Sequence, residues 1–122
     1  MNKRGKAGED FAASYLEKKG YEVVGRNYHS RYGEIDLVCV KGPYLVFVEV
    51  KERKRGSLVT PLEAVTRAKR EKLLFTAQQY LQRENPPPFL QPRFDVAAVT
   101  EEAGGSFTML YLENAFGEAD AD

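Results

Sequence analysis

Two apolar segments on either side of Gly42-Pro43 constrain the fold of this chain most. Residues 33–40 and 44–51 are rich in Val, Leu, Ile and Phe, and a Gly-Pro step between such segments is typical of a β-hairpin. In the second segment, side chains on both faces are apolar until Glu49, as in a strand covered on both sides. The hairpin therefore predicts two strands of a central sheet that carries helices. Alternation along the first strand puts Glu34, Asp36 and Val38 on one face and Ile35, Leu37 and Cys39 on the other.

Two helices are predicted from apolar spacing and from end signals. Residues 6–19 place apolar side chains at helical spacing before a glycine, and residues 60 to about 83 do so over a longer segment. Thr60 and Glu63 have the spacing of a capping box, and Pro61 suits the first helical position. The second helix is therefore predicted to begin at Thr60.

Three further strands complete the predicted fold. Residues 21–28 precede the hairpin, and residues 93–100 and 107–113 follow a proline-rich connection. The order αβββαββ predicts an α/β fold with a mixed central sheet flanked by helices. The 122 residues suit one domain, which we place at residues 1–113. Residues 114–122 are acidic and poor in apolar side chains, and we expect them to form a frayed tail.

Composition excludes several classes of protein. One cysteine, Cys39, and one histidine, His29, are too few for a disulfide framework or a zinc cluster. No apolar run approaches the ~20 residues that span a bilayer, and the basic start leads into acidic residues rather than a signal-peptide core. We therefore expect a cytoplasmic protein without a membrane partner. The chain has 18 basic and 18 acidic residues, and residues 1–72 hold 16 of the basic but only 10 of the acidic ones. This uneven distribution permits a basic binding face.

Charged side chains enter the hairpin abruptly at its open end. If the hairpin is symmetric, the numbers of paired residues sum to 85, which puts Asp36 opposite Glu49. The same register puts Glu34 opposite Lys51. At ~5 Å and an effective dielectric of ~20, two carboxylates repel each other by roughly 3 kcal/mol, which a divalent cation removes. The pair predicts a Mg²⁺ or Mn²⁺ site, with Lys51 placed to orient a water or offset phosphate charge. The alternative is a solvated strand end whose charged residues pair with neighbouring basic side chains.

Other charged residues lie near this predicted site. Glu9 is at the edge of the apolar stripe of the first helix, as either a metal or water ligand or a first-turn acid favoured by the helix dipole. Lys69 is at the centre of the apolar stripe of the second helix, so it needs an acidic partner, a phosphate or solvent at the core edge. Arg53, Lys54 and Arg55 form a basic loop where phosphates can dock, although such runs are also typical of solvated loops.

Several short motifs together resemble a known bacterial family. They are Gly8-Glu9, Arg26-Asn27-Tyr28, Gly33-Glu34-Ile35-Asp36-Leu37, Val46-Phe47-Val48-Glu49-Val50-Lys51 and Arg93-Phe94-Asp95-Val96. With these motifs the chain resembles the YraN-like family, which looks like a branch of the PD-(D/E)xK nuclease superfamily related to archaeal Holliday junction resolvases. The resemblance implies a restriction-endonuclease-like core. Ile35 stands where the superfamily pattern expects proline, and the second predicted helix lacks a Gln-x-x-x-Tyr signature.

The resemblance also implies roles for individual residues. Asp36 and Glu49 match the metal ligands, and Lys51 matches the motif lysine. Glu9 matches a helical acid of this branch, and Lys69 matches a recurrent helical lysine. A homodimer is implied by the resemblance alone.

From the residues and the resemblance we expect a Mg²⁺-dependent (or Mn²⁺-dependent) hydrolase, a structure-selective endonuclease that cuts DNA. RNA stays open as a substrate, and Asp95 stays open as either a catalytic or a strand-end hydrogen-bonding residue. One alternative is a nucleic-acid-binding module on the same fold that does not cleave, and another is a protein-interaction adaptor that uses the acidic second half. The expected catalytic residues are Asp36, Glu49, Lys51 and Glu9, and the expected nucleic-acid contacts are Arg53, Lys54, Arg55 and Lys69.

Overall fold

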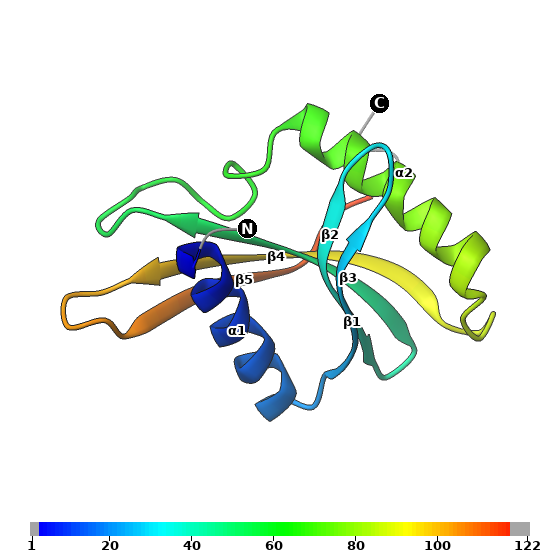
Figure 1. Ribbon diagram of the computed structural model, residues 1–122, viewed down its shortest axis with the longest axis horizontal. Helices are drawn as coiled ribbons and strands as arrows, with labels where there is room; N and C mark the ends of the chain where they lie inside the picture. Colours follow the sequence, from blue (N-terminus) through cyan, green and yellow to red (C-terminus); the bar gives the residue numbers. More distant parts are fainter. Residues whose placement is uncertain (1–2, 118–122) are drawn as a thin grey trace.

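The computed structural model describes residues 3–117 as two helices and one five-stranded sheet (Figure 1). The strands lie in the order β1-β2-β3-β4-β5; β3 and β4 are parallel, and the other neighbours are antiparallel. The predicted αβββαββ order and mixed sheet are confirmed. The elements are α1 (Lys3–Lys18), β1 (Glu22–His29), β2 (Glu34–Lys41), β3 (Tyr44–Arg53), α2 (Arg67–Glu84), β4 (Gln91–Glu101) and β5 (Phe107–Phe116).

The two helices pack on opposite faces of the sheet. Ala12 and Leu16 of α1 lie in one buried cluster with Val48 of β3. Leu73 of α2 lies in the other cluster with Phe47, the neighbour of Val48. Because β3 is apolar on both faces, the sheet that contains it can be covered on both sides. The sheet therefore forms the middle layer of a three-layer arrangement. Within residues 3–117, neither helix is both long and apolar enough to cross a membrane.

The predicted register of the β2–β3 hairpin is confirmed. Leu37 pairs with Val48 and Lys41 with Tyr44, so the numbers sum to 85. This paired stretch ends at Leu37, one residue before Asp36 would face Glu49.

The prediction that Ile35 shares a face with Leu37 and Cys39 was wrong. Ile35 is buried in the cluster beneath α2, whereas Leu37 and Cys39 are buried beneath α1. The change of side coincides with the end of the β2–β3 ladder. There the carboxylate of Asp36 accepts a hydrogen bond of 2.7 Å from the Val50 N–H group, in place of a backbone partner on β2.

The predicted start of the second helix was also wrong. The Thr60–Glu63 capping box forms, with hydrogen bonds of 3.1 and 3.2 Å, but it closes a single turn. Helix α2 begins at Arg67, because Thr66 has extended backbone and its side chain caps the Lys69 N–H group. For α1, residues 6–19 were predicted and Lys3–Lys18 is observed.

The prediction of a frayed tail from Asn114 was wrong for residues 114–116. Strand β5 continues to Phe116, which is buried and stacks on Phe94 with ring centroids 5.0 Å apart. Asn114 has a positive φ of 50°, and its N–H group is bound by Asp95, so an irregularity lets the strand continue. Residues 118–122 lie outside the described part. The remaining predicted strand ends fall within two residues of the observed ones.

Candidate active site

Asp36 and Glu49 meet where β2 and β3 stop pairing. Glu49 is only 6% exposed, and its side chain is on the α2 side of the sheet, as Phe47 is. The pKa of the Asp36 carboxyl group is raised well above its ordinary value, first by burial and then by a hydrogen bond with, and repulsion from, Glu49. The predicted contact between the two carboxyl groups is therefore present. Without a cation, burial and the neighbouring Glu49 favour the protonated form of Asp36.

Lys69 of α2 forms an ion pair with Glu49. Its Nζ atom lies 3.4 Å from Oε2 of Glu49. Of the alternatives left open for Lys69, the structure shows the acidic partner, whereas the predicted placement of Lys69 in a buried stripe was wrong. Because α2 begins at Arg67, Lys69 lies in the first turn and its side chain is partly exposed.

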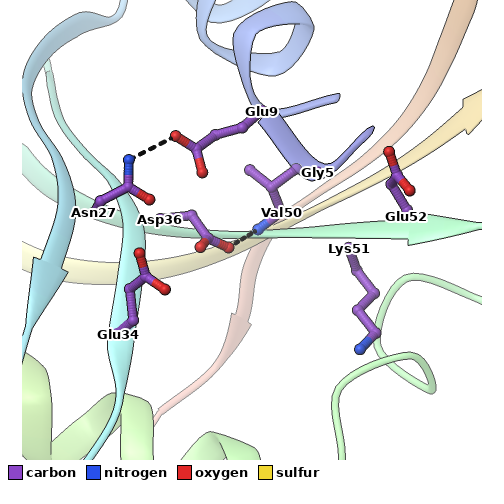
Figure 2. A pocket seen from close by; sticks show the side chains of 8 residues that line it. All are labelled: Gly5, Glu9, Asn27, Glu34, Asp36, Val50, Lys51 and Glu52. Atoms are coloured by element: carbon purple, nitrogen blue, oxygen red, sulfur yellow. Dashed lines mark hydrogen bonds between the residues drawn. The ribbon is translucent and has the colours of Figure 1, made fainter. Parts of the chain in front are cut away.

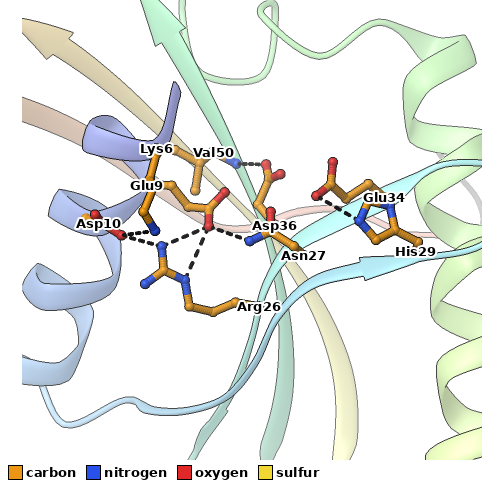
Figure 3. Close-up of polar contacts among 9 residues, drawn as sticks. All are labelled: Lys6, Glu9, Asp10, Arg26, Asn27, His29, Glu34, Asp36 and Val50. Carbon is orange, nitrogen blue, oxygen red and sulfur yellow. Dashed lines mark hydrogen bonds and ion pairs between the residues drawn. The ribbon is translucent and has the colours of Figure 1, made fainter. Parts of the chain in front are cut away.

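Glu9 of α1 is held in place by two residues of β1 (Figure 3). Oε1 of Glu9 accepts hydrogen bonds from Arg26, at 2.9 and 3.2 Å, and from Asn27, at 3.0 Å. Arg26 also bonds the exposed Asp10. Although only 5% exposed, Glu9 is close enough to Asp36 for its charge to help raise the Asp36 pKa. Glu9, expected in the site from the sequence, therefore lies at its edge next to Asp36.

Sequence reasoning assigned no role to Arg26 and Asn27, although both belong to a motif quoted above. Their contacts with Glu9 join α1 to β1 across 17 and 18 residues. Asn27 adopts a left-handed backbone with φ of 54°, which Asn tolerates better than most residues. The sequence signal that could have indicated a role for these two residues was the polar Arg26-Asn27 pair inside a predicted strand.

A pocket of about 310 Å³ opens beside Asp36 (Figure 2). Oδ1 of Asn27 is buried and has no hydrogen-bond partner among residues 3–117, so it can accept a bond from a bound water or ligate a cation. Together with the carboxylates, it makes the lining rich in the oxygen donors that hard cations prefer. The lining residues are Gly5, Glu9, Asn27, Glu34, Asp36, Val50, Lys51 and Glu52.

Lys51 lines the pocket but does not pair with Glu34. Figure 2 shows its side chain pointing away from Asp36. Glu34 instead lies 3.7 Å from Nε2 of His29, an ion pair when His29 is protonated. The predicted Glu34–Lys51 opposition was wrong, because the β2–β3 ladder ends at Leu37. The side chain of Lys51 makes no hydrogen bond or ion pair within the described chain.

The predicted basic loop faces a second hollow, of about 370 Å³, which it shares with Glu101 and Glu102 of the β4–β5 end. Arg53 donates a hydrogen bond to the Val59 carbonyl group and so holds the loop. Lys54 and Arg55 are exposed. Glu52 lines both hollows, so the loop adjoins the site but its cations do not line the pocket.

Asp95, left open between two roles, is a hydrogen-bonding residue. It is buried and accepts bonds from Nε and Nη2 of Arg93 at 3.0 and 2.8 Å. It also accepts bonds from the Tyr111 hydroxyl group, at 2.6 Å, and from the Asn114 N–H group, at 2.9 Å. Four donors occupy this carboxylate, which therefore stabilises the β4–β5 pair.

Across residues 3–117, no three Asp, Glu, His or Cys side chains are grouped closely enough to hold a metal by themselves. The donor set consists of the Asp36–Glu49 pair and the buried Asn27 oxygen. Two carboxylates fit Mg²⁺, which usually retains several waters.

Comparison with known proteins gives a family match over most of the chain. The model of a family described as "Uncharacterised protein family UPF0102" matches residues 8–99. A UPF0102 protein of Syntrophomonas wolfei is 46% identical over 89% of this chain and 93% of its own length. One of Rhodococcus opacus is 42% identical over 92% and 94%, and one of Symbiobacterium thermophilum is 44% identical over 95% and 98%. The YraN-like resemblance is confirmed at this level.

Proposed function

We propose that this chain, which belongs to the UPF0102 family, is a metal-dependent nuclease that hydrolyses phosphodiester bonds, with branched or otherwise structured DNA as substrate. The observation that carries the proposal is the contact between the Asp36 and Glu49 carboxyl groups beside an open pocket. The αβββαββ order and mixed sheet support a restriction-endonuclease-like core and, through it, the relation to the PD-(D/E)xK superfamily and archaeal resolvases.

Asp36 and Glu49 would hold Mg²⁺ or Mn²⁺. Glu49 is buried and Asp36 half-buried, so the two carboxyl groups in contact are unfavourable as a doubly charged pair, and a divalent cation offsets that repulsion. Asp36 lines the pocket, which leaves room for water and a phosphate oxygen next to its carboxyl group. When bound, the metal would stabilise charge on the phosphate and lower the pKa of a water.

The chain's own residues would position the reactants. Lys69 offsets the charge of Glu49 and, because it is partly exposed, can contact a phosphate from the α2 side. Glu9, fixed by Arg26 and Asn27, borders the pocket from the α1 side and can orient a water. Lys51, which has no partner within the described chain, would turn toward the pocket when a phosphate is present and orient the attacking water.

A cleavage screen with a matched pair of variants tests this proposal. Purified protein is incubated with Mn²⁺ and four-way junction, flap, single-stranded and duplex DNA, and with single-stranded RNA. We expect wild type to cut at least one substrate and Asp36→Asn to lose the activity by 100-fold or more, in the usual range for a metal ligand or general acid–base group (about 10²–10⁴-fold). Asp10→Asn, which changes an exposed acid on α1, should cut like wild type.

Equal inertness of wild type and Asp36→Asn on every substrate would contradict the proposal. The second candidate is then a nucleic-acid-binding module that does not cleave. It is favoured by one observation, the direction of the Lys51 side chain, which points away from Asp36 (Figure 2). In that case binding would fall with salt, would gain nothing from Mg²⁺ and would survive Glu49→Gln.

A further inference from the structure

An exposed aromatic pair joins the tip of the β1–β2 hairpin to α2. The rings of Tyr32 and Phe75 lie 5.2 Å apart, centroid to centroid, and their residues are 44% and 51% exposed. In Figure 1 this tip, coloured cyan, lies against the green helix α2. Aromatic rings that pack on each other usually do so in a core, and here both remain open to solvent.

The tip is fixed on the helix. The Ser30 and Thr76 hydroxyl oxygens lie 2.7 Å apart, and Thr76 also donates to the Lys72 carbonyl group. Oγ of Ser30 accepts hydrogen bonds from the backbone N–H groups of Tyr32 and Gly33, at 3.0 and 3.2 Å. A Cβ atom on Gly33 would lie 3.5 Å from Cβ of Lys72, so the backbone and the helix are in contact. The aromatic pair is therefore held in one position before any ligand binds.

Cations surround the pair. The guanidinium group of Arg31 lies over the Tyr32 ring, 5.7 Å from its centroid, and Lys72 is exposed beside Gly33. We call Arg31, Tyr32, Lys72 and Phe75 the aromatic platform. Along residues 67–72 of α2, four side chains are basic and one is acidic. This charge suits a polyanion more than a neutral or acidic partner.

The aromatic platform continues into the candidate active site along two elements. Lys69, Lys72 and Phe75 follow at three-residue spacing, so each neighbours the next on the surface of α2. Six residues of helix span about 9 Å from the Glu49 partner Lys69 to Phe75. On β2, Glu34 of the acidic pocket follows Gly33 directly.

From this continuity we propose that the aromatic platform stacks unpaired bases of a nucleic-acid strand whose phosphate lies at the candidate active site. The proposal rests on the proposed function and narrows its substrate class to nucleic acids with single-stranded residues beside the cut, such as flaps and branched ends. In a duplex the faces of the bases are covered by their neighbours, whereas unpaired bases offer a free face to aromatic side chains. Arg31 and Lys72 contact the flanking phosphates.

Binding is measured separately from cleavage to test the platform. Fluorescence anisotropy follows labelled single-stranded, flap and fully duplex oligonucleotides bound to Asp36→Asn protein in EDTA. On that background, Phe75→Ala and Tyr32→Ala should each weaken binding to single-stranded and flap oligonucleotides about tenfold, with little effect on the duplex. Phe75→Trp should restore binding. Phe89→Ala, at a residue 75% exposed beyond the end of α2, is the matched control and should bind like its parent.

The outcomes separate the platform from the nuclease. Equal binding by the Phe75→Ala, Tyr32→Ala and Phe89→Ala proteins would overturn the platform and leave the nuclease standing. Binding that depends on Phe75, with no cleavage by wild type, would overturn the nuclease alone. A change of oligomeric state in Phe75→Ala with unchanged oligonucleotide affinity would assign the patch to self-association and also overturn the platform.

Discussion

The carboxyl group of Asp36 accepts a hydrogen bond from the Val50 N–H group and also contacts the carboxyl group of Glu49. The first contact favours the charged form, but burial and Glu49 outweigh it, so the pKa rises. In the folded chain without metal, Asp36 therefore binds a proton more tightly than in the unfolded chain. Its contribution to stability is complete below the ordinary Asp pKa near 4 and is lost as pH rises toward the raised pKa.

We predict that Asp36→Asn stabilises the metal-free protein at pH 7–8. Asn keeps an oxygen for the Val50 N–H group and removes the charge, so the free energy of unfolding should rise by about 1 kcal/mol or more, a few degrees in Tm. Thermal unfolding in EDTA measures this, and the gain should vanish near pH 4. Asp10→Asn is the control, for which we expect a change in stability of the opposite sign. The hydrogen bond from Arg26 lowers the Asp10 pKa, so the charged form of Asp10 favours the folded state. An Asp36→Asn protein that is less stable than wild type at pH 8 would contradict the account.

At the scale of elements, local rules predicted the strand register but not the helix start. The turn at Gly42-Pro43 and the strand alternation fix the pairing of Leu37 with Val48, so the meeting of Asp36 and Glu49 was accessible from the sequence. Thr60 and Thr66 both satisfy the rules for an N-cap, and the choice between them depends on tertiary packing.

Replacing each threonine separately tests this choice. Thr66→Ala should lower the free energy of unfolding by about 1 kcal/mol, because it removes the cap of an 18-residue helix that carries Lys69. Thr60→Ala should cost less, because its box closes one exposed turn. Urea denaturation followed by circular dichroism measures both, and a larger loss for Thr60→Ala would show that the turn at residues 61–64 matters more than the cap.

At the scale of the whole molecule, both helix layers contribute to one site. Glu9 acts on Asp36 from α1 and Lys69 contacts Glu49 from α2, at the point where the β2–β3 ladder has ended. The sequence could not predict the Arg26–Glu9 contact, which depends on how α1 crosses the sheet. Nor did its charge asymmetry persist in space, because Arg53, Lys54 and Arg55 share a hollow with Glu101 and Glu102.

Calorimetric titration of Mn²⁺ into wild type, Asp36→Asn and Asp10→Asn tests the central claim, a metal site built on Asp36 and Glu49, without any choice of substrate. We predict one binding event in wild type and in Asp10→Asn, with release of a proton at neutral pH because the cation replaces the proton held by Asp36. Asp36→Asn should lose it. Absence of binding to wild type, or equal binding to all three proteins, would contradict the account.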